Sequence, residues 1–392
     1  MIKKNIEEIT EKDLQALIDN SVLESKTIEY KQSLPAKNDS SKTEFLADVS
    51  SFANASGGDL IFGIVENRKT GVPKNLAGLE IENVDREINR LESIIRDGID
   101  PRITGITIKP IELSNSKTIL IIRIPRSWNI PHRVIFGGHD EFYSRSTNGK
   151  YRLDVSELRM AFNLSNTIAE RIRRLREDRI SKILANETPI PFLKTPKIVL
   201  HLIPIISLNP AQIYDISKIH NDPTKMPPIN SSGLDYKINF DGFLTYSQDN
   251  ERKLSSYVQL FKNGIIEAVE SRLLVEHGEK LLIPSYRYEW YLIQSLDYYL
   301  DVFQILNVDP PVFIFLTLLG VKGYSMSVDR GISLNYESEI IDRDILLLPE
   351  VVIESYNIIK HNVLKPCFDS IWNACGYPRS MNYNEDEKWN PN

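Results

Sequence analysis

The sequence predicts an α+β protein with two folded domains, and three observations lead to this prediction. The chain has 392 residues, enough for about two or three hydrophobic cores. Strand-like and helix-like patterns are interleaved without the regular alternation of a parallel α/β sheet. The proline-rich stretch "TPIPFLKTPK" separates two patterned regions. We therefore expect an N-terminal α/β domain at 1–165, a basic helical linker at 166–195, a second α+β domain at 196–380 and a disordered tail at 381–392.

The overall composition is that of an ordinary soluble protein, with 42% hydrophobic and 26% charged residues. The net charge of −6 gives no global attraction to nucleic acid, so any such binding needs a local patch. Cys367 and Cys375 make neither a disulfide framework nor a zinc cluster. The first 20 residues have no apolar h-region, so we do not expect a signal peptide there, and the longest apolar run, 312–321, is roughly half a membrane span. A cytoplasmic protein without a membrane partner is expected.

In the N-terminal half the patterns predict helices and strands in an irregular order. A helix after Thr10 presents Leu14, Leu17 and Ile18 on one face. A strand is expected within 25–34, and then a helix over 40–55 with a capping box from Ser41 to Glu44. Further elements are a strand at 59–65, a helix at 85–96, strands at 103–113 and 117–125, a hairpin at 139–154 turning at Asn148-Gly149, and a helix at 154–163.

The remaining elements are predicted in the same way. A separate polar helix is expected at 165–187, with strands at 197–205, 239–248 and 256–269, the last turning at Asn263-Gly264. An aromatic-rich buried helix at 286–306 and a core strand at 310–321 follow. This half carries no catalytic signature, and our hypothesis is that it senses a partner or drives self-association.

The glycine pair Gly57-Gly58 could belong to a phosphate-binding loop or end a helix. A phosphate loop places its glycines after a strand and before a helix, so that free N–H groups point at the anion. Here the order is reversed, and no GxxxxGK[ST] motif occurs. Glycine just after a helix is the usual left-handed terminator. The sequence therefore predicts a helix end and no nucleotide P-loop.

Glu29 and Lys31 are two residues apart, so on a strand both side chains project from the same face. A carboxylate beside a lysine suits a site in which the acid holds a divalent metal and the lysine offsets phosphate charge. A solvated ion pair explains the same two residues. Glu24 reaches the same place only if it lies in the turn before the strand, and Glu66 only if its strand is a neighbour.

Three motifs in order, "ESKTIEYKQS", "SFANASGGDLIFGIVEN" and "FYSRSTNGKYRLDVSEL", together resemble the Schlafen-type AlbA domain over about residues 20–165. In ribonucleases of that family three acids form a metal-dependent site that cleaves transfer and ribosomal RNA. The resemblance implies Glu24, Glu29 and Glu66 as metal ligands for Mg²⁺ or Mn²⁺, with Lys31 as the fourth catalytic residue. The third acid is Asp in the animal proteins, and their zinc cluster and second lobe have no counterpart here.

The resemblance leaves several functions open. The first is a metal-dependent endoribonuclease acting on structured RNA such as tRNA, or on single strands. The second is a non-catalytic DNA- or RNA-binding module, such as a transcriptional regulator. A scaffold or sensor role, a part in anti-phage defence and homo-oligomerisation are also compatible with the family.

Candidate nucleic-acid contacts are arginines in two regions. Arg133, Arg145 and Arg152 lie around the hairpin with Phe142, Tyr143 and Tyr151 among them, a mixture that suits unpaired bases and phosphates. Aromatic side chains facing the core explain the tyrosines equally well. The linker adds further cations, which a solvated helix face also explains: Arg171, Arg173 and Arg174. His132 and His139 are expected to be ordinary surface or hydrogen-bonded histidines.

Overall fold

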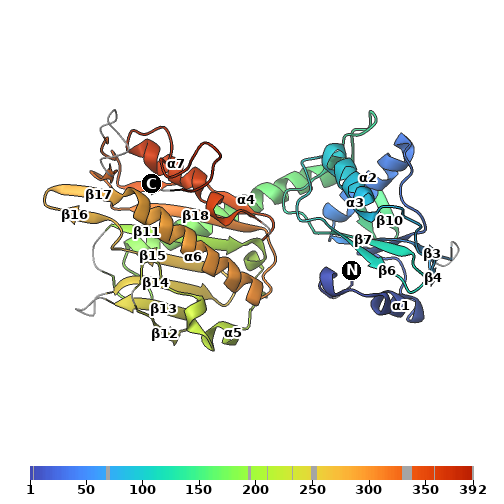
Figure 1. Cartoon of the computed structure of the whole chain (residues 1–392), viewed down its shortest axis with the longest axis horizontal. Coiled ribbons are helices and arrows are strands. Elements are labelled where there is room, and N and C mark those ends of the chain that lie inside the picture. The colour runs from blue at the N-terminus through green and yellow to red at the C-terminus, as the bar shows by residue number, and fades with distance from the viewer. Residues whose placement is uncertain are drawn as a thin grey trace. The chain divides into compact units, whose positions relative to one another are not determined.

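The computed structural model describes residues 1–2, 4–67, 71–192, 196–209, 211–231, 233–248, 254–328, 338–356 and 358–390. The chain divides into two compact units, Met1–Ala169 and Glu170–Asn392 (Figure 1). Each unit combines helices with sheets, which confirms the predicted α+β class. None of the described helices is long and apolar enough to cross a membrane.

The N-terminal unit is built on a four-stranded sheet with helices on both faces. Its strand order is β1-β2-β7-β6, and only the β1–β2 pair is parallel. The strands are β1 (Ile28–Lys31), β2 (Gly58–Phe62), β7 (Thr118–Ile124) and β6 (Thr107–Glu112). One face packs against α2 (Asp39–Ala53) and α3 (Val84–Gly98), and the other against α1 (Glu11–Asp19) and the short helix η1 (Ile6–Glu8).

Alternating side chains on the strands explain why both faces are covered. On β2, Leu60 and Phe62 enter the core beneath α2, while Ile61 enters the core beneath α1. β7 repeats this pattern with an apolar residue at nearly every position. β1 and β2 are the two strands of a βαβ unit whose helix is α2. They therefore lie next to each other and are parallel, with β1 at the edge of the sheet.

A second, smaller sheet lies beside α2. Its strands are β10 (Gly149–Arg152), β9 (Glu141–Ser146), β8 (Arg133–Val134) and β5 (Ile99–Asp100), in that order. β9 and β10 form the predicted hairpin, with Ser146 opposite Gly149, whose φ is +101°. A separate pair, β3 (Ile64–Glu66) and β4 (Pro73–Leu76), carries the chain away from β2.

Three local predictions for this unit need correction. The cap of α2 is Asn38, whose side chain accepts from the Ser41 N–H at 2.8 Å, rather than the box at Ser41. The single strand expected at 59–65 is interrupted at Gly63, whose positive φ starts β3 in another direction. The helices expected at 154–163 and 165–187 form one continuous helix, α4 (Val155–Leu184), because no glycine or proline interrupts the segment.

The C-terminal unit is built around an eight-stranded antiparallel sheet ordered β12-β13-β14-β15-β11-β18-β20, with β21 also paired to β18. Its strands are β12 (Asp235–Ile238), β13 (Gly242–Gln248), β14 (Leu254–Phe261), β15 (Ile266–Glu270), β11 (Lys197–Pro204), β18 (Val312–Leu319), β20 (Ile345–Leu347) and β21 (Val351–Ile353). α6 (Ser285–Ile305) crosses one face, as Figure 1 shows.

Smaller elements complete this unit. A three-stranded sheet contains β16 (Val275–His277), β17 (Lys280–Pro284) and β19 (Ser325–Ser327). The helices are α5 (Ser217–His220), α7 (Lys365–Ala374) and the short turns η2 (Ile205–Leu208), η3 (Pro223–Lys225) and η4 (Lys360–Asn362). The sequence patterns predicted β11, β13, β14, β15, α6 and β18, and did not predict β12 or the short strands.

The segment expected to be a separate solvated linker is part of the C-terminal core. Ile180 and Ile183 of α4 are buried against the second face of the large sheet. Arg179 donates from two guanidinium nitrogens to the carboxylate of Glu267, at 2.7 and 2.8 Å. That carboxylate is fully buried and also accepts from Tyr257 at 2.7 Å and lies 3.0 Å from His201. The buried ion pair between Arg179 and Glu267 therefore holds this part of α4 against the large sheet.

The tail expected to be disordered is packed instead, over its described residues 381–390. Trp389 donates from Nε1 to the buried carboxylate of Glu289 at 3.0 Å, and Tyr383 forms a β-bridge with Trp389. Burial raises the pKa of Glu289. The polar composition that predicted disorder missed Trp389 and Tyr383, whose apolar rings are buried or half-buried here. Residues 391–392 lie outside the described part of the chain.

Replacing Glu267 with Ala should destabilise the C-terminal unit by about 3–5 kcal/mol, because it leaves the Arg179 guanidinium in the interior without its carboxylate. Urea unfolding of the full chain measures the change. The matched control is Glu350→Ala, which removes the carboxylate partner of Arg173, another arginine of α4, from an exposed ion pair and should cost less than about 1 kcal/mol. Equal losses in the two variants would contradict the proposed role of the buried pair.

Candidate functional site

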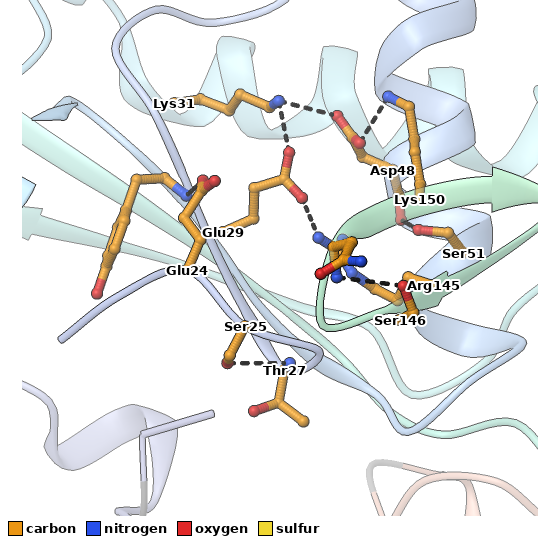
Figure 2. Close-up of polar contacts among 12 residues, drawn as sticks. Glu24, Ser25, Thr27, Glu29, Lys31, Asp48, Ser51, Arg145, Ser146 and Lys150 are labelled. Carbon is orange, nitrogen blue, oxygen red and sulfur yellow. Dashed lines mark hydrogen bonds and ion pairs between the residues drawn. The ribbon is translucent and has the colours of Figure 1, made fainter. Parts of the chain in front are cut away.

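Glu29 on β1 is the centre of a cluster of charged side chains in the N-terminal unit (Figure 2). Lys31 lies on the same strand face, as the spacing predicts, with its Nζ 2.6 Å from Glu29 Oε1. The other carboxylate oxygen of Glu29 accepts from Arg145 of β9. The Arg145 guanidinium is buried and lies over the Phe52 ring, 3.8 Å from its centroid. Both oxygens of Glu29 are therefore bonded to cations.

Asp48 of α2 extends the cluster toward the hairpin. Its buried carboxylate lies 3.5 Å from the Lys31 ammonium and 2.7 Å from that of Lys150 on β10. Lys150 also pairs with the exposed Glu44. One buried acid thus holds two lysines from different elements. In Figure 2 Lys31 and Lys150 reach Asp48 from opposite sides.

Glu24 and Glu66, the other two predicted acids, lie at the edge of this cluster. Glu24 is in the turn before β1, where a bridge between Ser25 and Ile28 folds the chain back. Its Oε1 accepts from the Tyr30 N–H at 2.8 Å. Glu24 therefore lies in the turn before the strand, as the sequence requires if it is to reach the region of Glu29. Glu66 ends β3, and its buried Oε2 has no hydrogen-bond partner among the described residues.

The pKa shifts reflect this crowding of charges. Burial raises the pKa of Glu24, and the nearby Glu29 and Glu66 raise it further. Burial alone would raise the pKa of Glu29, but Arg145 and Lys31 outweigh it and lower this pKa. Burial raises the pKa of Asp48, with an added contribution from Glu29 that Lys150 opposes. Such a group of perturbed acids and bases is typical of functional sites.

In this conformation the acids do not fit a divalent cation. No group of three or more His, Cys, Asp or Glu side chains within the described ranges is placed to hold one. Metal ligands need free carboxylate oxygens, and those of Glu29 are both in ion pairs. The assignment of Glu24, Glu29 and Glu66 as metal ligands, and of these residues with Lys31 as catalytic, stays a prediction.

The structure also places the six predicted nucleic-acid-binding arginines. Each contacts a protein group, and one of these contacts, between Arg174 and Glu170, is an i,i+4 pair of the kind that a solvated helix face predicts. Arg145 is buried on Glu29, whereas Arg133 pairs with Asp100 and Asp140, and Arg152 pairs with Glu141. On α4, Arg171 donates to the Leu208 carbonyl, Arg173 pairs with Glu350, and Arg174 lies 3.9 Å from Glu170. Of the hairpin aromatics only Tyr151 is exposed.

The glycine pair and His132 have structural roles. Gly57 has a φ of +69° and donates to the Phe52 carbonyl at 2.9 Å, so it ends α2 as predicted. A Cβ on Gly58 would lie 2.4 Å from the Phe52 ring. His132, expected at the surface or in hydrogen bonds, is buried with Nδ1 2.7 Å from the Pro101 carbonyl, and burial lowers its pKa. His139 is exposed.

Comparisons with known proteins agree with the resemblance. Residues 24–154 match the family model described as "Schlafen, AlbA_2". The N-terminal unit contains a Schlafen AlbA_2 domain. The matched segment runs from Glu24 to Asp154, so it includes every residue of the charged cluster. A search of curated proteins finds no match.

Two solved structures are similar to part of the chain. One is the DIP2311 protein from Corynebacterium diphtheriae, with 16% identity, a TM-score of 0.26 and coverage of 37% of this chain. The chain spans 26% of the length of that protein. The other is the N-terminal domain of a RecG-related protein from Nitrosomonas europaea, with 23% identity, a TM-score of 0.25, and coverage of 36% of this chain and 86% of that domain.

Sequence reasoning missed two members of the cluster, Asp48 and Lys150. Asp48 did leave a signal, because it interrupts a buried helix segment between Phe45 and Val49, where a lone acid needs a partner. Lys150 left none, since nothing in the sequence pairs a hairpin residue with a helix 102 positions away.

Replacing Arg145 with Met should destabilise the N-terminal unit by about 3–5 kcal/mol, because Glu29 keeps only Lys31 as a cationic partner. Combining Arg145→Met with Glu29→Gln should cost clearly less than the sum of the single changes, with a coupling of about 1–3 kcal/mol. Urea unfolding of the four proteins gives the cycle. Arg152→Met, which removes an exposed pair from the same hairpin, should change stability by less than about 1 kcal/mol. Additive single changes would disprove the coupling.

Proposed function

We propose that the N-terminal unit binds nucleic acid and that phosphate groups contact Lys31 and Lys150. The observation that carries this proposal is the shared carboxylate of Asp48, which fixes both ammonium groups close together. The Schlafen AlbA_2 match over residues 24–154 supports it, because the resemblance to this family implies a nucleic-acid substrate.

The two lysines are suited to an anion with several oxygens. Their side chains are 33% and 20% exposed, so each ammonium is held by the protein while part of it remains open to solvent. A cation that is already positioned loses less conformational entropy when it binds than a free surface lysine does. Beneath them, Nε and Nη1 of Arg145 have no hydrogen-bond partner among the described residues. The site therefore has more donors than its own acids use.

A single strand or an unpaired loop is the form of nucleic acid that the surroundings favour. Tyr151 follows Lys150 on β10 and is 39% exposed, so its side chain projects from the opposite face of the hairpin, where its ring offers a separate stacking face. Stacking on an aromatic ring needs an unpaired base, whereas a duplex presents only its backbone and groove edges. RNA such as tRNA provides both unpaired loops and a dense phosphate backbone.

Metal-dependent cleavage is a second candidate, and the mutual influence of the three acids favours it. The charges of Glu29 and Glu66 both raise the pKa of Glu24, so the three carboxylates lie in one region. The buried Oε2 of Glu66 is an unused acceptor. Because both oxygens of Glu29 are engaged by cations here, we derive no hydrolytic step through a metal ion.

Changing Lys31 or Lys150 to Met in the full chain should weaken binding to fluorescently labelled tRNA and single-stranded DNA. Each change should reduce affinity by about tenfold and lower the slope of log K against log salt by about 1. Anisotropy titrations at several salt concentrations measure both quantities. Lys12→Met, an exposed change on α1 at the opposite face of the sheet, is the control and should leave both unchanged. Unaltered binding by folded Lys31 and Lys150 variants would refute the phosphate contact.

The cleavage candidate has its own test. Wild-type protein and Glu29→Gln are incubated with tRNA and single-stranded DNA in Mn²⁺, and the products are separated on denaturing gels. Cleavage by the wild type that Glu29→Gln loses, with binding retained, would support an active site at the three acids. Equal cleavage by both proteins would rule out that site, and tight binding without products would leave binding as the only activity.

A further inference from the structure

The C-terminal unit leaves one edge of its large sheet open. β12 is the last strand on that side, and among the described residues its only strand neighbour is β13 (Figure 1). All four of its side chains, Asp235 to Ile238, are exposed. An open edge presents unpaired N–H and C=O groups, which favours pairing with another strand.

The backbone of β12 shows which groups point outward. The Asn239 N–H donates to the Gly242 carbonyl at 2.9 Å, so this pair is a hydrogen-bonded one. Hydrogen-bonded and non-bonded pairs alternate along an antiparallel ladder. Lys237 and Asp235 therefore bond to β13, while the N–H and C=O groups of Tyr236 and Ile238 point away from the sheet.

The opposite edge is built differently. There β18 is flanked by two strands of three residues each, β20 and β21, which are separated along the chain. Short, interrupted edge strands are a common protection against pairing with other chains. β12 has no such interruption, since its register with β13 is continuous and it contains no proline.

We propose that β12 pairs with β12 of a second copy of this chain, antiparallel, about a two-fold axis at Tyr236. In this register Asp235 lies opposite Lys237 of the other copy, and the same pair forms again on the other side of the axis. Neither residue forms an ion pair within the described part of its own chain. Opposite charges directly across an antiparallel pair stabilise it, whereas like charges destabilise it.

The two neighbouring registers are excluded by the direction of the backbone N–H and C=O groups and by the charges of the facing side chains. An axis at Lys237 places two lysines opposite each other, and an axis at Asp235 places two aspartates opposite each other. With the axis at Tyr236, the outward N–H and C=O groups of Tyr236 meet their own copies, and Ile238 meets Leu234. Backbone direction therefore limits the axis within β12 to Tyr236 or Ile238, and of these only the axis at Tyr236 places Asp235 opposite Lys237.

The apolar face of β12 is already ordered for this contact. The Tyr236 ring lies 5.8 Å from the His220 ring and 6.1 Å from that of Phe243, which hold it against the unit. Its exposed fraction is nevertheless 50%, and that of Ile238 is 56%. A second copy would cover both side chains. This interface belongs to the C-terminal unit and does not depend on the proposed nucleic-acid contacts.

Charge exchange on β12 in the full chain tests the proposal. Wild-type protein should form a dimer in analytical ultracentrifugation. Asp235→Lys and Lys237→Asp should each weaken dimerisation by about tenfold or more, because each replaces two attractive pairs with two repulsive ones. Mixing these two variants should restore a heterodimer, and the double variant Asp235→Lys/Lys237→Asp should restore a homodimer. Lys280→Asp, the same charge change at an exposed residue of β17, is the control and should leave the dimer unchanged.

Ile238→Pro provides a test that does not involve charge. Proline removes an N–H that points away from β13, so the unit should keep its thermal unfolding transition while the dimer is lost. A monomeric wild-type protein at 100 µM, about the upper range for specific weak dimers, would overturn the proposal. A dimer that persists in both single-charge variants and in Ile238→Pro would also overturn it, because that dimer would use another surface.

Discussion

The ion pair between Glu29 and Arg145 is the interaction on which the N-terminal unit depends. It joins β1 of the main sheet to β9 of the hairpin across 116 positions of sequence. Because Arg145 also lies on the Phe52 ring, the pair fixes the hairpin against α2. Lys150 reaches Asp48 only when the hairpin lies there. The lysine pair is therefore a consequence of the buried Glu29–Arg145 contact.

The C-terminal unit contains a similar buried carboxylate, that of Glu267. Both oxygens of Glu267 are occupied by groups of the same unit, and Arg179 and His201 outweigh burial to lower its pKa to about 2. These contacts hold α4, and Nδ1 of His201 has no hydrogen-bond partner among the described residues. In the N-terminal cluster Arg145 has two unpaired nitrogens and Glu66 has one unpaired oxygen among the described residues. The feature on which the proposed phosphate contact rests is therefore the pair of partly exposed lysines, Lys31 and Lys150.

Local patterns predicted most of the fold because side-chain periodicity reports burial directly. The shared face of Glu29 and Lys31 and the helix end at Gly57 followed from such rules. The cluster could not be assembled in the same way, since Arg145 and Glu29 meet only through the packing of β9 on α2. Alternation along β9 places Arg145 on the same face as Tyr143 and opposite to Phe142 and Ser144. It does not say which of the two faces is buried. Arg145 was therefore interpreted as a nucleic-acid contact, when in the structure it is the buried partner of an acid.

The sequence patterns did not predict the edge strand β12, for a related reason. Its residues are all exposed, so it shows no burial pattern, and its strand structure comes from pairing with β13 alone. A strand with no buried face gains little stability from its own side chains, and its outward N–H and C=O groups gain from a partner chain. A dimer formed there carries two copies of the charged cluster. If the clusters bind nucleic acid as proposed, a strand that contacts both copies would be held at two sites, and its affinity would exceed that for one cluster.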